Sequence, residues 1–515
     1  MWAQARLPES LRRHVESKST QLVDVIVHGT PDEVRTLAAR HGLRIKKTLT
    51  EGAVLEASAA GVEALAADVD HLSRDVEVMP FMAVTNAAIG ADQVQAGLEG
   101  LSSFTGAGVG VAIIDSGVWA GHRALAGRVV FAKDFVSDDS PRFNAAVRGG
   151  GAPAPNHDPY GHGTHIGATI AGSSPYPVDS TSQTPFRGVA PGANLISLRV
   201  IGADGTGKAS DVIAAIQWVI QNKKRFNIRV INLSLGGPAE QSYRDDAMCE
   251  AVERAVHEGI VVVAAAGNRG KDAEGNSVHG LIESPGIDPH VITVGALNTK
   301  GTARRSDDVL ATYSSKGPTL VDGLLKPDIA APGNKIVSAE AQGASLVASY
   351  PALHATGVGA DAYASLSGTS MATGVVSGAV ALVLEANKGL TPALVKMTLQ
   401  SSATFMPEVG LVGAGAGSLN TAAAIGVALN GPVQQTTAIG GEMVQSTGVM
   451  TAVDSSLRAD KDRVNSREIM WGDEIMWGDE ILWGEHLIWG DHLIWGDHLI
   501  WGDHLIWGDH LIWGD

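Results

Sequence analysis

The chain has 515 residues, more than one ordinary domain needs, so a large core and at least one accessory segment are expected. Its net charge of −17 and the lack of a basic stripe argue against a nucleic-acid partner. The single cysteine, Cys249, excludes an intrachain disulfide, so packing and any bound ions must stabilise the fold. Cys249 lies within a helical pattern and is interpreted as a buried small hydrophobic residue, not as a nucleophile.

Residues 1–20 are interpreted as a leader of unknown structure. Met1–Arg6 is followed by polar residues and not by the apolar stretch of a signal peptide. No apolar run reaches the length of a membrane span, and Ile260–Ala266 is predicted to be a buried strand.

Residues 21–85 are predicted to form a small α+β domain with the element order β-α-β-β-α-β, which is the ferredoxin-like pattern. Thr30 to Glu33 reads as a capping box with Pro31 at the first helical position, and Gly42 ends the helix. The expected elements are a strand at Val23–Val27, the helix through Val34–His41, two strands within Leu43–Ala57, a helix at Gly61–Val69 and a strand at Val76–Val84.

Residues 86–430 are predicted to form an α/β domain, because continuous apolar strands alternate with helical patterns. Such strands indicate a parallel sheet with helices on both faces, and its ligands bind at the carboxyl ends of the strands. The expected strands are Val109–Ile114, Asn194–Val200, Val230–Leu233, Ile260–Ala265 and Val291–Val294, and the expected helices include Val212–Gln221 and Cys249–Glu258.

The C-terminal part of the chain changes character twice. Residues 431–466 lose periodicity and gain Thr, Gln, Ser and Gly, so they are interpreted as a linker. Residues 467–515 repeat a unit that settles to Leu-Ile-Trp-Gly-Asp-His, with a Trp every six residues. An even period suits a strand and favours stacked β-solenoid coils, while a disordered low-complexity tail is the alternative. The apolar content makes self-association or surface attachment of this tail plausible.

Three short motifs supply an Asp, a His and a Ser at strand ends and helix starts. Asp115 ends an apolar strand in Gly-Val-Ala-Ile-Ile-Asp-Ser-Gly, His162 opens a helix in Gly-His-Gly-Thr-His, and Ser370 precedes the small apolar helix Met371–Leu384. Because these positions converge on one rim of a parallel sheet, the three side chains can meet.

This set of residues fits nucleophilic acyl transfer. A serine hydroxyl needs a base in hydrogen-bond reach, His supplies one near neutral pH, and a buried carboxylate orients the imidazole and stabilises its cation. Asn268, at the end of another strand, could bind the oxyanion of the tetrahedral intermediate together with the backbone N–H of Ser370.

The chain resembles the subtilisin-type serine proteases over roughly residues 86–425. Asp115-Ser-Gly, His162-Gly-Thr-His, Asn268 after Ala-Ala-Gly, and Gly-Thr-Ser370-Met-Ala occur in the family's order. The resemblance implies a three-layer α/β fold with a mainly parallel sheet, a serine endopeptidase that needs no cofactor for its chemistry, and protein or peptide substrates. It also implies that His165 is a structural helix residue and not the base.

The same resemblance assigns a substrate cleft. The segments around Gly205 and around Ser234 would each add a strand to a bound peptide, and Glu283 would lie near the floor of the P1 pocket and favour Lys or Arg. An ordinary glycine turn and a solvated loop Glu are the alternatives for the first segment and for Glu283. The full set of expected substrate-binding residues is Gly205, Gly207, Ser234, Leu235, Gly236, Ala265, Gly267 and Glu283.

By resemblance, residues 21–85 are the family's inhibitory propeptide, cut near Met82–Asn86 to release a secreted, extracellular or cell-surface enzyme. A stable N-terminal domain is the alternative. Structural calcium is common in the family, and Gln93 resembles a ligand position, but no metal site can be assigned. The sequence departs from the family at Gly374, where a Pro is usual, and in a longer loop that includes residues 149–155.

Two other classes of function remain open on the sequence. One is a weakly active subtilase fold that serves as a binding or processing scaffold, with the repeats as the working part; the complete Asp115, His162, Asn268 and Ser370 set argues against it. The other is a serine esterase, which the lack of a Gly-x-Ser-x-Gly elbow and the order of the three residues disfavour.

Overall fold

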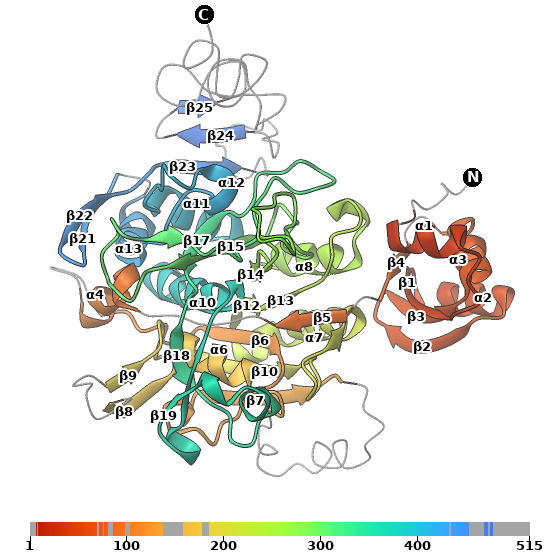
Figure 1. The fold of residues 1–515 in the computed structure, drawn as a ribbon, viewed down its shortest axis with the longest axis horizontal. Helices are drawn as coiled ribbons and strands as arrows, with labels where there is room; N and C mark the ends of the chain where they lie inside the picture. Colours follow the sequence, from red (N-terminus) through yellow and green to blue (C-terminus); the bar gives the residue numbers. More distant parts are fainter. Residues whose placement is uncertain are drawn as a thin grey trace, which may run out of the picture.

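The computed structural model describes residues 7, 9–69, 72–75, 77–80, 86–97, 103–136, 158–177, 185–431, 434–452, 468–471 and 474–476. The described residues form a small N-terminal domain, a large α/β body and a short C-terminal sheet (Figure 1). Residues 1–6 of the expected leader, the expected cleavage segment at 81–85, the long loop within 137–157 and the repeats from Trp477 onward lie outside the described residues.

The N-terminal domain has the ferredoxin-like order that the sequence predicts. Its sheet runs β2-β3-β1-β4, with β3 and β4 flanking β1 and all neighbours antiparallel. The buried core lies between this sheet and the helices. The elements are α1 (Glu9–Glu16), β1 (Val23–His28), α2 (Pro31–His41), β2 (Arg44–Leu49), β3 (Gly52–Ala57), α3 (Ala59–Ala66) and β4 (Leu72–Arg74).

The helix-capping residues predicted for this domain make capping contacts in the structure. Thr30 and Glu33 form the reciprocal capping box at the start of α2, and Gly42 ends the helix in the left-handed conformation with φ 64°. The second helix, α3, begins earlier than expected because Ser58 caps it through the N–H of Gly61.

The strand expected at Val76–Val84 is wrong as the fourth strand of this domain. That place is taken by the earlier β4, which pairs with β1. The chain then forms β5 (Glu77–Pro80), which leaves the domain and pairs with two edges of the body. The apolar pattern of this segment predicted its extended conformation but not the strands with which it pairs. Pairing depends on which strand edges are free nearby.

The body is built on a mainly parallel sheet with the order β16-β15-β14-β12-β6-β10-β7, and β17 also pairs with β15. Each neighbouring pair is parallel except β15 with β16. The strands are β6 (Gly110–Asp115), β7 (Val129–Asp134), β10 (Asn194–Arg199), β12 (Ile228–Leu233), β14 (Val261–Ala265), β15 (Ile292–Asn298), β16 (Val309–Leu310) and β17 (Ile329–Pro332).

Helices cover both faces of this sheet, which confirms the expected three-layer α/β fold (Figure 1). On one side α10 (Thr369–Ala386) packs on the sheet together with α6 (His162–Ala171), α11 (Pro392–Ser402) and α13 (Thr421–Asn430). On the other side lie α7 (Ala209–Phe226) and α8 (Ala247–His257).

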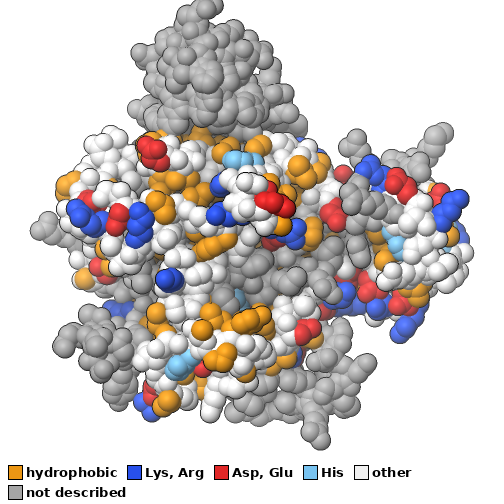
Figure 2. Space-filling view, viewed as in Figure 1, with side chains coloured by type: hydrophobic (Ala, Val, Ile, Leu, Met, Phe, Trp, Pro, Cys, Tyr) orange, Lys and Arg blue, Asp and Glu red, His pale blue; other side chains and the backbone are white. Residues whose placement is uncertain are grey.

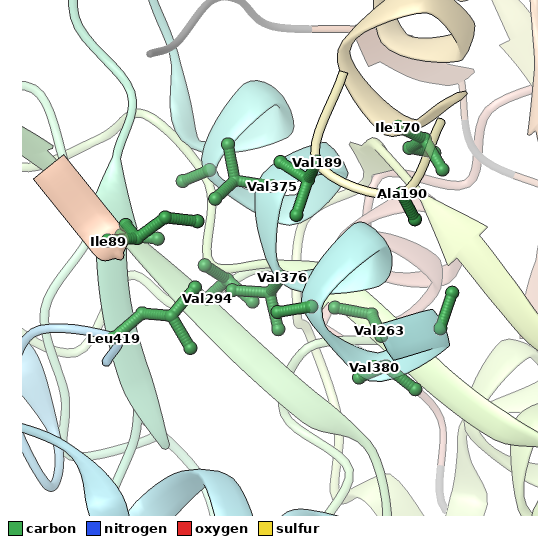
Figure 3. Close-up of a cluster of buried hydrophobic side chains, with 14 of the residues drawn as sticks. Ile89, Ile170, Val189, Ala190, Val263, Val294, Val375, Val376, Val380 and Leu419 are labelled. Carbon is green, nitrogen blue, oxygen red and sulfur yellow. The ribbon is translucent and has the colours of Figure 1, made fainter. Parts of the chain in front are cut away.

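The central helix α10 is the packing centre of the larger core. Its side chain Val376 lies by Val294 of β15, Val380 lies by Val263 of β14, and Val375 lies by Val189 (Figure 3). Within the described residues α10 alone is long and apolar enough to cross a membrane, yet 89% of it is buried inside the domain, as expected of a core helix.

Shorter elements complete the body. The sheets β8–β9 and β18–β20–β19 lie at the lower edge of the body in the view of Figure 1. Their bounds, with those of the remaining short helices, are β8 (Ser173–Pro177), β9 (Pro185–Arg187), β18 (Ile336–Ala339), β19 (His354–Thr356), β20 (Tyr363–Leu366), α4 (Ala91–Ala96), α9 (Ser345–Ser349), α12 (Leu411–Ala414), η1 (Ala87–Ile89), η2 (Arg123–Leu125), η3 (Tyr243–Asp245), η4 (Pro351–Leu353) and η5 (Gly359–Asp361).

The sheet of the N-terminal domain packs on α7 and α8. Ile26, Leu49 and Val54 join the core cluster of those helices. Asp75 accepts hydrogen bonds from Ser210 at the start of α7, from its N–H at 3.0 Å and its hydroxyl at 2.8 Å. Charged side chains of both signs lie along the lower edge of this domain in the view of Figure 2.

The first part of the expected linker is folded and not extended. Three strands form there, β21 (Thr436–Ile439), β22 (Glu442–Gln445) and β23 (Val449–Ala452), and β23 packs on α11. Glu442 accepts backbone hydrogen bonds from Arg305 at 2.7 Å and Ser306 at 3.0 Å, so this segment is anchored to the body.

Parts of two C-terminal repeats are described, and both of these parts are strands. They are β24 (Glu468–Trp471) and β25 (Glu474–Met476), and they continue an antiparallel sheet from β23. The strand character agrees with the even repeat. The antiparallel pairing differs from the parallel stacking of a β-solenoid in these two repeats.

Candidate active site

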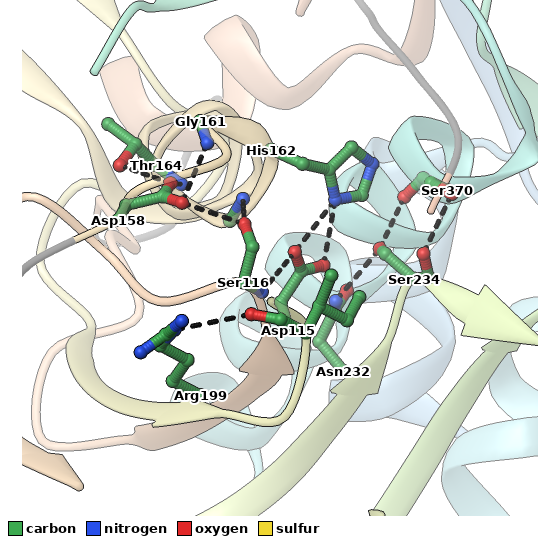
Figure 4. A network of polar contacts seen from close by, with 12 residues as sticks. Asp115, Ser116, Asp158, Gly161, His162, Thr164, Arg199, Asn232, Ser234 and Ser370 are labelled. Carbon is green, nitrogen blue, oxygen red and sulfur yellow. Dashed lines mark hydrogen bonds and ion pairs between the residues drawn. The ribbon is translucent and has the colours of Figure 1, made fainter. Parts of the chain in front are cut away.

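Three elements bring the predicted Asp, His and Ser to one rim of the sheet. Asp115 is the last residue of β6, His162 is the first of α6, and Ser370 is the second of α10. All three side chains are fully buried in this structure. Figure 4 shows the His162 imidazole between the Asp115 carboxylate and Ser370.

The Asp115 carboxylate and the His162 imidazole are in direct contact. The imidazole Nδ1 lies 2.8 Å from Oδ1 and 2.9 Å from Oδ2 of the carboxylate. The N–H of Ser116 also donates to Oδ1 at 2.7 Å. Gly163 permits the close approach of α6 to the end of β6, because a Cβ there would lie 2.0 Å from the carbonyl oxygen of Gly117.

Ser370 is fixed by a neighbouring strand end. Its Oγ donates to the carbonyl oxygen of Ser234 at 2.9 Å, and the Ser234 hydroxyl donates to the carbonyl oxygen of Ser370 at 2.7 Å. The amide of Asn232 donates to Ser234 Oγ at 2.9 Å, and Ser377 of α10 donates to the Asn232 Oδ1 at 2.9 Å. Asn232 and Ser377 were not singled out by the sequence.

Asn268 lies beside the start of α10. Its Oδ1 accepts hydrogen bonds from the N–H and from the hydroxyl of Thr369, each at 3.0 Å. Since the oxygen is engaged in this way, the NH₂ group is the part of the amide that remains to donate to a ligand. Thr369 precedes Ser370, so this donor and the Ser370 backbone lie in the same corner of the site.

Asp158 is a buried site residue that sequence reasoning missed. It accepts four hydrogen bonds, from the N–H of Gly161 at 2.7 Å, the N–H of Thr164 at 2.8 Å, the hydroxyl of Thr164 at 2.7 Å and the hydroxyl of Ser116 at 2.8 Å. Burial raises the pKa of this carboxyl, and the Thr164 hydrogen bonds oppose the rise. The contacts tie the first turn of α6 to the end of β6 (Figure 4). The spacing Asp-x-x-Gly-His could have signalled a cap for this helix.

His165 lies in the same helix and has a different environment. Its Nε2 faces the carbonyl oxygens of Ala364 at 3.2 Å and Ile336 at 3.3 Å, so Nε2 carries the proton. Burial, with a smaller effect from His162, lowers the pKa of His165 to about 3. A histidine that stays neutral in this way is a structural residue, as the resemblance implies.

Two strand edges of the body enclose β5. Gly207 and Lys208 of β11 (Gly207–Lys208) pair antiparallel with Val78 and Glu77. On the other side Leu235 and Gly236 of β13 (Leu235–Gly236) pair antiparallel with Pro80 and Met79. The chain's own segment thus occupies the place that the sequence predicted for a peptide strand.

Glu283 lies against two of the residues that the sequence predicted to bind substrate. A Cβ on Gly267, where φ is +100°, would lie 2.8 Å from Glu283 Cγ, and one on Gly236 would lie 3.1 Å from its Cβ. The carboxylate is buried and pairs with the Nε of Arg269 at 2.7 Å, so a solvated loop Glu is excluded. Burial raises the pKa of Glu283, and the charge of Arg269 opposes the rise. The ion pair with Arg269 was not anticipated.

Several predicted residues are not at the cleft edges or have another contact. Gly205 lies in the turn before β11 and donates to Gly202, outside the paired residues. Ala265 ends β14 and pairs with Val294 in the central sheet. Cys249 is fully buried on α8, and burial raises its pKa well above its usual range, as expected of an inert thiol.

The amide nitrogen of Gln93 donates to the carbonyl oxygen of Ala438 at 2.6 Å, which ties α4 to β21. The role of Gln93 as a calcium ligand stays a prediction, and structural calcium is common among the proteins that the site resembles.

The fold and this arrangement define a subtilisin-like serine protease. Residues 106–442 match the Subtilase family, and the chain belongs to that family. It is 36% identical to the serine protease AprX of Bacillus subtilis over 62% of this chain and 66% of AprX, and 34% identical to subtilisin DY of Bacillus licheniformis over 65% and 96%. The chain is a serine endopeptidase, a hydrolase that acts on peptide bonds of protein substrates.

A solved structure supports the fold. Fervidolysin from Fervidobacterium pennivorans, described as a keratinolytic enzyme related to subtilisin, superposes with a TM-score of 0.60 at 22% identity. The similarity covers 84% of this chain and 64% of that one. Subtilases need no cofactor for catalysis.

Proposed function

We propose that Asp115, His162 and Ser370 are the catalytic triad of this endopeptidase. The observation that carries the proposal is the pair of short contacts between the Asp115 carboxylate and His162 Nδ1. This contact leaves Nε2 of the imidazole as the base for the Ser370 hydroxyl. As Ser370 Oγ attacks the peptide carbonyl carbon, its proton passes to His162, and the buried carboxylate stabilises the imidazolium that forms.

The later steps follow from the same groups. The carbonyl oxygen becomes an oxyanion, and we assign the Asn268 NH₂ and the N–H of Ser370 as its donors. His162 then gives its proton to the leaving amine, and the C–N bond breaks to leave an acyl group on Ser370. Water, deprotonated by His162, attacks this ester, and the Ser370 hydroxyl is regenerated.

The edges of β11 and β13 are proposed to bind substrate as an added strand. Two backbone edges supply hydrogen bonds that depend little on side chains, which suits a protease that accepts many sequences. The antiparallel pairing of β5 with both edges supports this assignment, because β5 is itself a peptide held there.

The N-terminal domain is proposed to be an inhibitory propeptide. Its support is threefold: β5 fills the cleft edges, the three catalytic side chains are buried in this state, and the domain packs on α7 and α8. Cleavage after β5, within 81–86, would free a new N-terminus and allow the domain to leave. A covered active site would also protect the cell that makes the enzyme, which fits a protease that works outside the cell or at its surface.

The deciding experiment uses purified full-length chain and a Ser370→Ala variant. The parent should lose its N-terminal domain on incubation and should be labelled by a fluorophosphonate probe at Ser370. The variant should stay uncut and unlabelled. If the pure variant were still cut near residue 85, autoprocessing would be refuted, and a parent that is not labelled would refute the triad. Labelling without casein hydrolysis would point to an esterase.

The inhibitory role can be tested without touching the catalytic groups. Asp75→Asn, made in the separately added N-terminal domain, weakens the two hydrogen bonds to Ser210, each worth about 1 kcal/mol. The inhibition constant for the mature enzyme should rise about tenfold. Asp32→Asn, on the exposed face of α2, is the control and should leave the constant unchanged.

For specificity, Glu283 is proposed to favour Lys or Arg at P1. The carboxylate lies against Gly236 and Gly267, and a basic P1 side chain could pair with it in place of Arg269. Glu283→Gln should lower kcat/KM for a Lys substrate by about tenfold relative to a Leu substrate. Equal losses of kcat/KM on both substrates would show that Glu283 does not determine P1 specificity.

A further inference from the structure

One cluster of potential metal-ligating side chains lies on elements other than those that carry Asp115, His162 and Ser370. It forms where α8 packs against the segment that leads into β15. Glu253 comes from α8, and Asp288 and His290 come from that segment. One ligand atom from each lies within 4.8 Å of the other two, and no other group of three His, Cys, Asp or Glu side chains in the described part of the chain meets this condition.

The distances in this cluster suit an ion better than hydrogen bonds. His290 Nδ1 lies 3.4 Å from Glu253 Oε1 and 3.4 Å from Asp288 Oδ1. Good hydrogen bonds between such atoms are about 2.7–3.2 Å long, and Nδ1 makes none with the described residues. Tetrahedral ligands about 2.1 Å from a zinc ion are about 3.4 Å from one another. The observed spacing therefore matches two edges of a zinc tetrahedron.

Asp288 adds an independent indication. Its side chain is fully buried, and its Oδ2 has no hydrogen-bond partner among the described residues. The nearby ammonium of Lys326 does not serve it, because that group bonds Val291 O at 3.2 Å, Thr293 Oγ1 at 2.8 Å and Asp328 Oδ2 at 2.7 Å. A buried carboxylate with an unused oxygen is costly, and a cation would remove this cost.

We propose that Glu253, Asp288 and His290 bind a zinc ion, with water as the fourth ligand. One imidazole nitrogen and two carboxylate oxygens are a zinc donor set, whereas calcium and magnesium prefer oxygen ligands alone. The Glu253 and His290 side chains are 28% and 23% exposed, so an ion can enter from solvent. The two carboxylates carry a charge of −2, which the ion neutralises.

The ion would be structural. It would join α8 to the segment that begins at Glu283. The same helix contacts the N-terminal domain through Glu250 with His28 and through Arg254 with Glu51. Bound zinc would thus stiffen one support of both the pocket floor and the domain interface, and it would stabilise the native state by linkage.

The test uses the full-length Ser370→Ala chain, which is expected not to digest itself, after removal of metals with a chelator. Zinc binding is measured by isothermal titration and by metal content after gel filtration, alongside the melting temperature. Glu253→Gln and His290→Ala should each lose one equivalent of zinc and the associated rise of several degrees in Tm. Glu258→Gln, a carboxylate on the same helix segment that pairs with Lys223, should keep both.

The C-terminal repeats also contain His and Asp and could bind zinc themselves. The site is therefore judged by the difference in zinc content between the parent and the ligand variants. Equal zinc content in the parent and in both ligand variants would overturn the site. So would stabilisation by calcium but not by zinc. Glu253→Gln keeps the shape of a partly exposed side chain, so its loss of one equivalent with unchanged circular dichroism cannot be ascribed to unfolding.

Discussion

Ser234 and Ser370 bond each other in both directions, hydroxyl to carbonyl oxygen, at 2.7 and 2.9 Å. Ser234 also precedes β13, the edge that pairs with β5. Ser234 thus links the position of Ser370, the proposed nucleophile, to the position of the edge that pairs with β5. If Ser370 is the nucleophile and this edge binds substrate, as proposed, Ser234 holds both in a fixed relation to each other.

Ser234→Ala is expected to lower kcat by about 10- to 100-fold, because the Ser370 backbone loses a hydrogen bond and small misplacements of a nucleophile are costly. Steady-state kinetics on a chromogenic peptide, with active-site titration, measure the effect. Ser377→Ala is the matched control. It removes a buried hydroxyl that bonds Asn232 and does not contact Ser370 through this chain of hydrogen bonds directly, so kcat should fall less. An unchanged kcat for Ser234→Ala would disprove the seating role.

Asp115→Asn is expected to reduce kcat by about 10⁴-fold. The amide keeps the shape of the site and can still accept the hydrogen bond from Ser116, but it no longer holds the imidazole in the required tautomer or stabilises its cation. The measurement is kcat with the same peptide, and circular dichroism verifies folding. A loss below about 100-fold would be incompatible with Asp115 as the triad carboxylate.

Asn268→Leu is expected to lower kcat by about 10²- to 10³-fold with little change in KM. That range is the one measured for the oxyanion-hole Asn of subtilisin, a member of this family. Thr369→Val is the control, since it removes one hydrogen bond to Asn268 Oδ1 but leaves the proposed NH₂ donor in place. If Asn268→Leu raised KM alone, its role would be in ground-state binding and not in the transition state.

Gly374 and Gly378 of α10 should respond oppositely to alanine. A Cβ on Gly374 would make ordinary contacts, the nearest at 3.5 Å to Thr169, whereas one on Gly378 would lie 2.5 Å from Val189 Cβ. Gly374→Ala should raise the free energy of unfolding by up to about 1 kcal/mol, and Gly378→Ala should lower it by about 1–3 kcal/mol. Thermal unfolding of the Ser370→Ala chain measures both. Destabilisation by Gly374→Ala would show that this helix start needs glycine.

The lowered pKa of His165 leads to a prediction of how the free energy of unfolding changes with pH. Burial lowers its pKa from 6.5 to about 3, so below pH 6.5 the unfolded chain binds a proton that the native state excludes. The contribution of His165 to the free energy of unfolding is therefore constant above about pH 6.5 and falls as the pH drops from 6.5 toward 3. Urea unfolding at several pH values should show a shallower acid loss in His165→Gln, and parallel curves would contradict this assignment.

The sequence predicted most of the fold from local signals. The apolar runs located β6, β10, β12, β14 and β15 to within a few residues. Capping residues located α2, because the hydrogen bonds of a helix end are made within a few residues of it. The folded segment at 434–452 was mistaken for a linker because its anchor, Glu442, bonds residues far away in the chain.

Of the site, the sequence by itself determined which residue types stand at strand ends and helix starts, and hence the identities of Asp115, His162 and Ser370 as candidates. Only the tertiary structure decided the partners: β5 with β11 and β13, Asp158 with the start of α6, and Glu283 with Arg269. Local patterns are set by backbone geometry and by burial of one face, which neighbouring residues encode. Edge pairing and buried ion pairs depend on distances between segments far apart in the chain, and those distances exist only after the chain has packed.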